Sequence, residues 1–233
     1  MNFSIISAGE GSRLASEGIS TPKPLITING ITLIDRLIDI FIRNDASSVS
    51  VIVNSENHRT IAHLRAKRLD VPFNLYIKST PGSMYSLYEL KPFLHDAPFC
   101  LTTVDTVFRE SEFIAFLKAF RNNHHIDGLM AVTDFVDDEK PLFLDVDGDL
   151  RILDFCDERP PTGKYVSGGM YCLRPAVWPV LDITMQNGMT RMRDFQRQLV
   201  RQGLRLKAFS FSKIVDIDHA EDIAVAEELV DSF

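Results

Sequence analysis

The first half of the chain alternates between short apolar runs and longer stretches whose apolar residues recur at helical spacing. This periodicity predicts strands over 3–6, 49–53, 71–77 and 99–104, and helices over 33–42, 56–69, 83–94 and 110–123. Strands that alternate with helices in this way pack as a parallel sheet covered by helices on both faces. The alternation therefore predicts the α/β class, in which ligands bind beyond the carboxyl ends of the strands.

The second half changes to a pattern with more strands. It predicts strands over 129–135, 142–146, 150–155, 165–173 and 204–211, and helices over 175–185, 192–202 and 220–230. Asp147-Gly148-Asp149 lies between two of these strands and predicts a β-hairpin. Because no repeat, low-complexity tract or linker separates the halves, we interpret the second as an extension of the same sheet.

Composition bounds the class of protein. The chain has 233 residues, 45% of them hydrophobic and 24% charged, which suits an ordinary globular protein with a full core. The net charge of -7 argues against a nucleic-acid surface, where a basic stripe is expected. No apolar run approaches the ~20 residues that a membrane helix needs, so membrane insertion is not expected.

The cysteines and the amino terminus bear on the compartment. Cys100, Cys156 and Cys172 lie in apolar segments without metal-ligand spacing, which predicts reduced core residues. The first residues lack a basic region followed by a long apolar run, so no signal peptide is expected. Both observations favour a cytoplasmic protein.

A glycine-containing loop with nearby cations follows the first predicted strand. Residues 7–13 read Ser-Ala-Gly-Glu-Gly-Ser-Arg, and Pro22-Lys23-Pro24 follows a few residues later. Glycines let backbone amides close around an anion, while Arg13 offers a forked pair of donors and Lys23 a compact charge. Leu14 replaces the third glycine of the dinucleotide fingerprint, and no Gly-Lys-Ser/Thr run is present. Taken alone, the loop also fits a glycine turn with solvated basic residues.

The strand, the loop and Pro22-Lys23-Pro24-Leu25 together resemble the signature of the nucleotidyltransferases, and more narrowly that of the sugar-1-phosphate nucleotidylyltransferases (NDP-sugar pyrophosphorylases). The resemblance implies a GT-A-like fold, with a Rossmann-like, mixed but mainly parallel sheet flanked by helices. It also implies one domain over 1–233, in which 1–125 binds the nucleotide and 126–233 binds the acceptor.

The expected nucleotide-binding residues lie at two strand ends. A second candidate turn, at 79–83, offers free amides at the start of a helix, which suit a nucleobase or a phosphate. The base stays open, because the family's base-reading glutamine has no counterpart upstream. The residues assigned to nucleotide binding are Ser7, Ala8, Gly9, Gly11, Gly82 and Ser83.

Two aspartates are the candidates for holding a metal ion. Asp105 follows a very apolar strand, and Asp218 closes the segment Val-Asp-Ile-Asp at 215–218. The resemblance implies that such a pair shares Mg²⁺, which prefers oxygen ligands; Asp216 is the alternative second ligand. Val104 replaces a usual glycine, and His219-Ala220 replaces a usual Thr-Pro. Either aspartate alone also fits a turn or a helix cap.

The expected acceptor site lies in the second half. Glu158-Arg159-Pro160 is similar to the family's Glu-Lys-Pro segment, whose glutamate binds sugar hydroxyls and whose lysine binds the sugar phosphate. An exposed charged turn is the alternative. Ser167 and Gly169 lie where the family's next strand flanks the sugar, and Gly169 would let a ligand approach the backbone. A simple β-bulge is the alternative there.

These residues lead to one expected activity. It is the Mg²⁺-dependent transfer of a nucleotidyl group from an NTP to a sugar 1-phosphate, with release of pyrophosphate and with Arg13 and Lys23 as the catalytic cations. A cytidylyltransferase for a phosphorylated alcohol such as phosphocholine is a rival, because 83–87 resembles that branch. A catalytically inactive nucleotide-sugar-binding relative is another. The expected partners are an NTP and a phosphorylated small molecule, and a homo-oligomer stays open.

Overall fold

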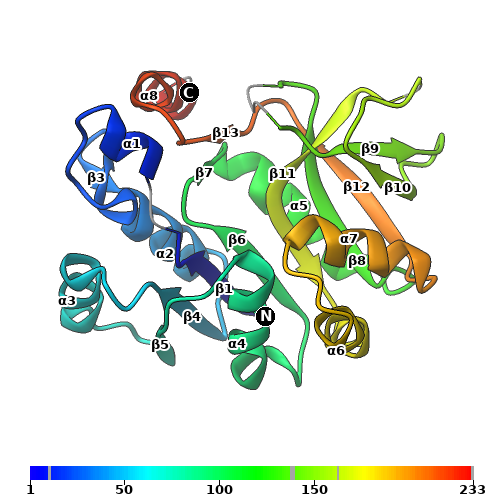
Figure 1. Ribbon diagram of the computed structural model, residues 1–233, viewed down its shortest axis with the longest axis horizontal. Coiled ribbons are helices and arrows are strands. Elements are labelled where there is room, and N and C mark those ends of the chain that lie inside the picture. The colour runs from blue at the N-terminus through cyan, green and yellow to red at the C-terminus, as the bar shows by residue number, and fades with distance from the viewer. Residues whose placement is uncertain (10–11, 137–139, 162, 232–233) are drawn as a thin grey trace.

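One nine-stranded sheet organises the protein in a computed structural model that describes residues 1–9, 12–136, 140–161 and 163–231. Its strands run in the order β10-β9-β11-β6-β1-β4-β5, with β8 pairing β11 and β12 pairing β8 (Figure 1). Their bounds are β1 (Asn2–Ser7), β4 (Ser48–Val53), β5 (Phe73–Ile77), β6 (Phe99–Thr103), β8 (Gly128–Thr133), β9 (Phe143–Val146), β10 (Ile152–Cys156), β11 (Tyr165–Leu173) and β12 (Leu206–Phe211).

The sheet is mixed but mainly parallel where the first half supplies it. Strand β1 pairs in parallel with β4 and β6, and β4 pairs in parallel with β5. Strand β11 is antiparallel to β6, β8 and β9, whereas β12 returns parallel to β8. The α/β class and the mixed, mainly parallel sheet flanked by helices are thus confirmed.

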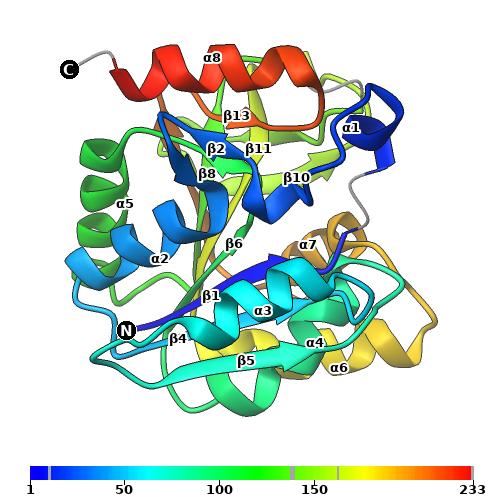
Figure 2. The same cartoon turned by 90° about the vertical axis from the view of Figure 1, so that its left-hand side faces the viewer.

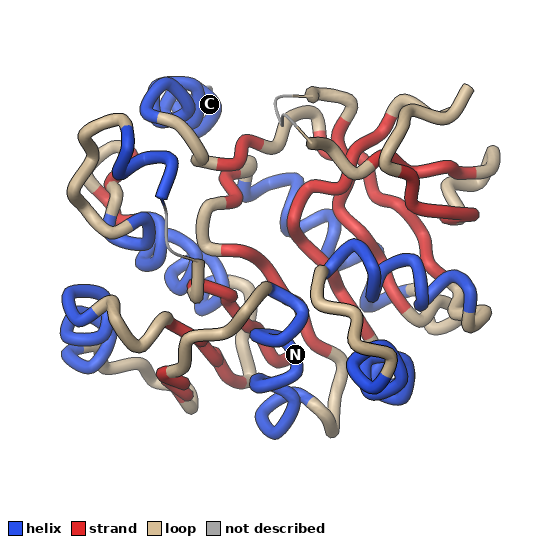
Figure 3. The backbone as a smooth tube through the Cα atoms, in the orientation of Figure 1, coloured by secondary structure: helices blue, strands red, loops and turns tan. Residues whose placement is uncertain are grey.

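Helices cover both faces of this sheet (Figures 2 and 3). They are α1 (Ser12–Ser16), α2 (Leu33–Arg43), α3 (His58–Ala66), α4 (Ser83–Leu94), α5 (Glu110–Asn122), α6 (Trp178–Gln186), α7 (Met192–Arg201) and α8 (Ala220–Asp231). Residues of α2, α3, α5 and α8 share one core cluster, and residues of α4, α6 and α7 share the other. In β1, Phe3 and Ile5 belong to the first cluster and Ile6 to the second, as the alternation of side chains along a strand requires.

Most predicted elements are present, and the differences lie at their ends. Helix α3 begins at His58 rather than at Glu56, because the Asn57 side chain accepts a hydrogen bond from the Thr60 amide (3.2 Å) and caps the helix. The stretch predicted as a helix over 175–185 is a 3₁₀ turn (Pro175–Val177) followed by α6. Among the described residues, no helix has the length and apolar character needed to cross a membrane.

Short elements that periodicity misses lie above the sheet. They are α1, a second 3₁₀ turn (Lys23–Leu25), the hairpin of β2 (Thr27–Ile28) with β3 (Ile31–Thr32), and the ladder of β7 (Thr106–Val107) with β13 (Val215–Asp216). Each is too short to show a hydrophobic period. Together they carry Arg13, Lys23 and Asp216, and they adjoin Asp105 and Asp218 in the sequence.

Candidate active site

A cleft of about 750 Å³ lies at the carboxyl ends of β1, β4 and β6. Backbone and side chains of 6–9, the turn at 79–83 and the turn at 103–105 line it, together with Arg13, Lys23 and Asp218. Because the carboxyl ends of parallel strands meet at one edge, segments far apart in the sequence converge there. The cleft therefore gathers residues from the front, the middle and the end of the chain.

A short ladder brings the two candidate metal ligands together. Strand β13 pairs antiparallel with β7, so that Asp216 lies opposite Thr106. The Ile217 amide also donates to the Asp105 carbonyl (3.1 Å). This backbone pairing fixes the turn that carries Asp218 beside the turn that carries Asp105, although more than 100 residues separate them.

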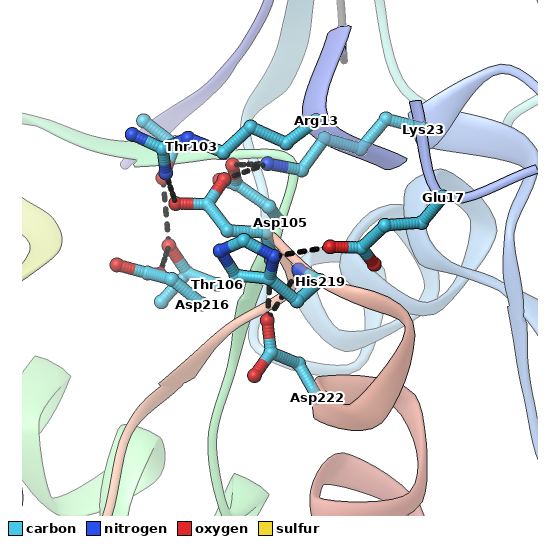
Figure 4. A network of polar contacts seen from close by, with 10 residues as sticks. Arg13, Glu17, Lys23, Thr103, Asp105, Thr106, Asp216, His219 and Asp222 are labelled. Carbon is cyan, nitrogen blue, oxygen red and sulfur yellow. Dashed lines mark hydrogen bonds and ion pairs between the residues drawn. The ribbon is translucent and has the colours of Figure 1, made fainter. Parts of the chain in front are cut away.

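Lys23 lies between the two carboxylates (Figure 4). Its Nζ atom is 2.5 Å from Asp105 Oδ2 and 2.8 Å from Asp218 Oδ1, and only 13% of its side chain is exposed. Burial alone would lower the pKa of Lys23, but attraction and hydrogen bonds from Asp105 and Asp218 raise it well above its usual range. Lys23 is therefore a fixed positive charge at any physiological pH.

Arg13 adds a second cation on the open side of the same carboxylate. Its Nη1 atom donates to Asp218 Oδ2 at 2.7 Å, and 47% of the side chain is exposed. Asp218 thus holds Lys23 with one oxygen and Arg13 with the other. The cations predicted from the first loop and the aspartates predicted from the strand ends meet at one place.

In the described part of the chain, Asp216 adjoins this group without an ion pair to Lys23 or Arg13. Thr106 Oγ1 donates to its Oδ1 atom (3.0 Å). The Asp216 residue is exposed towards a second cavity. Its carboxyl group nevertheless has protein atoms closely around it, and this desolvation, followed by repulsion from Asp105, raises the pKa of Asp216 to about 7. A third carboxylate in one place is costly unless a cation is near.

The carboxylates present fit a Mg²⁺ ion whose coordination shell is completed by the substrate. Mg²⁺ is commonly held by one or two carboxylates together with waters and substrate phosphates. Asp105 and Asp218 supply two such carboxylates within reach of one Lys23 nitrogen, and the Asp216 carboxyl is crowded by negative charge. Among the described residues no cluster of three His, Cys, Asp or Glu side chains forms a metal site by itself.

The residues assigned to nucleotide binding line the cleft where they are described. Ser7, Ala8, Gly9, Gly82 and Ser83 are all part of its wall, and Gly11 lies outside the described residues. The buried Ser7 Oγ has no hydrogen-bond partner among the described residues. An orphaned hydroxyl in the wall of a polar cleft is suited to a ligand.

Residues of the cleft that the sequence analysis missed lie at the end of β4 and in α4. Asn54 directly follows β4, its Oδ1 accepts from Ser79 Oγ (2.8 Å), and its Nδ2 reaches the Ala8 carbonyl (3.5 Å). Thr80 and Ser86 share a hydroxyl hydrogen bond of 2.7 Å. The position of Asn54 after a buried parallel strand was a signal that could have identified it.

Of the residues assigned to acceptor binding, some line a cavity and others do not. Ser167 lines a second cavity of about 270 Å³, which adjoins the first because Arg13 and Asp218 line both. Glu158 and Arg159 line neither cavity, and the Arg159 guanidinium lies over the Phe143 ring, 5.3 Å from its centre. The geometry at this segment therefore resembles the exposed charged turn.

Gly169 lies at an irregularity of β11, where the pairing with β8 shifts register between Ser167 and Tyr171. Its φ of +71° is in the left-handed region. An added Cβ would come within 3.0 Å of the hydroxyls of Thr103 and Thr106, so a side chain here would displace the support of Asp216. Gly169 thus packs against Thr103 and Thr106 beside the site. It also lies at a β-bulge.

An α/β sheet with two cations and two carboxylates gathered at its strand ends has the organisation of an enzyme that transfers groups between phosphates, and the comparisons define the class as nucleotidyltransferase. The chain belongs to the family of MobA-like NTP transferase domains, whose sequence pattern matches residues 4–200.

Two solved structures share the fold over nearly the whole chain. The inositol-1-phosphate CTP transferase from T. maritima is 21% identical with a TM-score of 0.79, covering 99% of this chain and 98% of its own. A putative glucose-1-phosphate thymidylyltransferase from Bacillus anthracis, in complex with a sucrose, is 16% identical with a TM-score of 0.84, covering 100% and 96%. No curated protein matches the sequence.

Proposed function

We propose that this nucleotidyltransferase moves a nucleotidyl group from an NTP to a sugar 1-phosphate with the help of Mg²⁺, forming an NDP-sugar and pyrophosphate. The observation that carries the proposal is the contact of Lys23 with both Asp105 and Asp218 inside a cleft at the strand ends. The two structural relatives, named for a CTP transferase and a putative thymidylyltransferase acting on 1-phosphates, support this substrate class.

In this reaction a phosphate oxygen of the acceptor attacks the α-phosphorus of the NTP, and the bond from that phosphorus to the bridging oxygen of pyrophosphate breaks. No protein nucleophile is needed, because catalysis consists of alignment and charge stabilisation. Lys23 is assigned to the reacting phosphates, and the more exposed Arg13 to the leaving pyrophosphate. Asp105 and Asp218 would hold Mg²⁺, which supplies Lewis-acid stabilisation of phosphate charge when bound.

The two cavities divide the substrates between them. The larger one, with the Ser7 hydroxyl and the turn at 79–83, is assigned to the nucleotide, and the smaller one, lined by Ser167, to the acceptor. Arg13 and Asp218 line both, so they mark the boundary between the two cavities. We assign residues 1–125 and 126–233 of a single domain to the two substrates on the same basis.

One observation favours a second candidate, a cytidylyltransferase acting on a phosphorylated alcohol with a cationic group, such as phosphocholine. The smaller cavity is lined by Asp216, Glu221 and Asp222, together with the aromatic ring of Phe135. Carboxylates suit an ammonium group better than a neutral sugar, while the Phe135 ring already carries the Lys213 ammonium 4.3 Å from its centre. The acceptor of the relative from T. maritima is an inositol phosphate, which carries hydroxyls instead.

A substrate panel separates these candidates. Pyrophosphate release is measured with each of the four common NTPs, with Mg²⁺, against sugar 1-phosphates, inositol 1-phosphate and phosphocholine. Activity with a sugar 1-phosphate supports the main proposal, and activity confined to CTP with phosphocholine supports the second. Nucleotide binding without turnover on any pair would contradict both and leave a binding protein.

The second metal ligand is tested by two matched substitutions. Because Asp218 holds Lys23 and Arg13 and Asp216 holds neither, Asp218→Asn is expected to lower kcat/KM by about 100-fold or more. For Asp216→Asn we expect a smaller loss, on the order of tenfold. Steady-state kinetics over a Mg²⁺ titration measure both. A larger loss and a larger shift in Mg²⁺ requirement for Asp216→Asn would reverse the assignment.

A further inference from the structure

A second contact joins the segment that carries Arg13 to the start of α8, next to Asp218. Glu17 follows α1 directly, and both of its carboxylate oxygens are used. Oε1 is 2.5 Å from His219 Nδ1 (Figure 4), and Oε2 accepts from the Ala220 amide at 2.7 Å. Since a carboxylate only accepts hydrogen bonds, the Nδ1 atom of His219 is the donor.

The contact is connected to the catalytic residues on both sides. The Glu17 amide donates to the Arg13 carbonyl (3.1 Å), one helical turn earlier, so one short segment presents Arg13 to Asp218 and Glu17 to the next two residues. Opposite, the Asp222 carboxylate accepts from the amides of Asp218 (2.8 Å) and His219 (2.6 Å) and stiffens the turn. Glu17 is therefore linked to Arg13 through the backbone and to Asp218 through the turn that carries His219.

The residue types explain why this chain can form the contact. Ala220 is the first residue of α8, where amides have no partner inside the helix. Glu17 accepts one of these amides from outside, at the end of the helix that favours negative charge. A proline at position 220 would have no amide hydrogen to donate. The pair His219-Ala220 is what provides two donors for Glu17.

We propose that Glu17 is a positioning residue that holds the Arg13 segment closed on the Asp218 turn before the nucleotide arrives; this rests on the proposed use of an NTP. Removing it leaves the site partly open, so nucleotide binding must first close it, and the apparent affinity falls by the closed fraction. We expect Glu17→Ala to lower kcat/KM for the NTP by about 10–100-fold, mainly through KM for the NTP.

The substitution Ala220→Pro tests the contact atom by atom. Proline fits the first position of a helix, so α8 is expected to form, but the amide that Glu17 accepts is removed. Ala220→Pro should raise KM for the NTP, as Glu17→Ala does. The double variant should have a kcat/KM only slightly lower than that of Glu17→Ala alone. Losses that multiply would show that the two residues act independently and would overturn the proposal.

Glu227 provides a matched control, because its Oε1 accepts from the Asn29 amide (3.2 Å) and also ties α8 to the N-terminal segment, away from the cleft. Glu227→Ala should change thermal stability about as much as Glu17→Ala and leave KM for the NTP unaltered. An equal rise in KM for both variants would reduce Glu17 to a structural contact.

Hydrogen exchange gives a readout without substrate. In the free protein the Ala220 amide should exchange faster in Glu17→Ala than in the wild type, whereas Glu227→Ala should leave it unchanged. Unchanged exchange in Glu17→Ala would overturn the proposal. A wild-type protein that neither binds nor turns over any NTP would contradict the proposed function. An active wild type whose Glu17→Ala variant has an unchanged KM for the NTP would contradict the positioning role alone.

Discussion

Replacing Lys23 with alanine is expected to lower kcat/KM by about a thousandfold, the effect of removing a positive charge aimed at a transition state inside a shielded site. Lys23 contacts both Asp105 and Asp218, and little of its side chain is exposed. Without it the two carboxylates lose their common positive partner. The reacting phosphates would then be stabilised less, and the free enzyme would hold Asp105 and Asp218 less firmly. Pyrophosphate release under saturating Mg²⁺ measures the loss.

Lys67→Ala is the matched control for this variant. Lys67 also forms a partly buried ion pair, with Asp35 at 2.9 Å, but it does not line the cleft. It should cost some stability and leave kcat/KM near that of the wild type. A Lys23→Ala variant with near-normal turnover would contradict the catalytic role, and Lys23→Arg should recover only part of the activity because the fork differs from the ammonium in shape.

The largest expected effect on stability belongs to Phe113 in α5. Its ring is fully buried and lies 5.0 Å from the ring of Phe108, 6.0 Å from Phe41 and 6.3 Å from both Phe3 and Phe116. Phe113→Ala removes the centre of this cluster, and such a cavity costs about 3–5 kcal/mol. Urea unfolding should show a lower midpoint with an unchanged slope.

Ile114 is the neighbouring control for Phe113, because half of its side chain is exposed on the same helix. Ile114→Ala should change the free energy of unfolding by less than about 0.5 kcal/mol. Phe113→Leu, which keeps most of the volume, should lie between the two. A Phe113→Ala variant as stable as Ile114→Ala would mean that the aromatic cluster is not the support of the β1 face that its packing indicates.

The sequence was sufficient for the sheet, its helices and the convergence of Lys23 with Asp105 and Asp218. Each of these depends on a strong local signal: an apolar strand, the polar residue directly after it, or a proline-flanked lysine. Because parallel strands end at the same edge, those local signals also predict where the residues meet. The family membership agrees with the resemblance found in the first loop.

The remainder depends on contacts that leave no local pattern. The pairing of β7 with β13 involves two residues from each strand, and Glu17 meets His219 across 202 positions. Neither spacing has a period that could be recognised. Glu158 and Arg159 show the reverse problem, since their motif was visible, yet their side chains lie outside both cavities.

Strand β11 pairs with β6 on one side and with β8 on the other, so the strands of the first and second halves of the chain belong to one continuous hydrogen-bonded sheet. Swinging one half over the other, as two-lobed enzymes do around a hinge, would require that sheet to tear. Substrate capture must then come from small adjustments of the short segments above the strands. Under the proposed function, the spacing of the nucleotide and acceptor sites would then be set by the sheet, because strands of one sheet carry both sites.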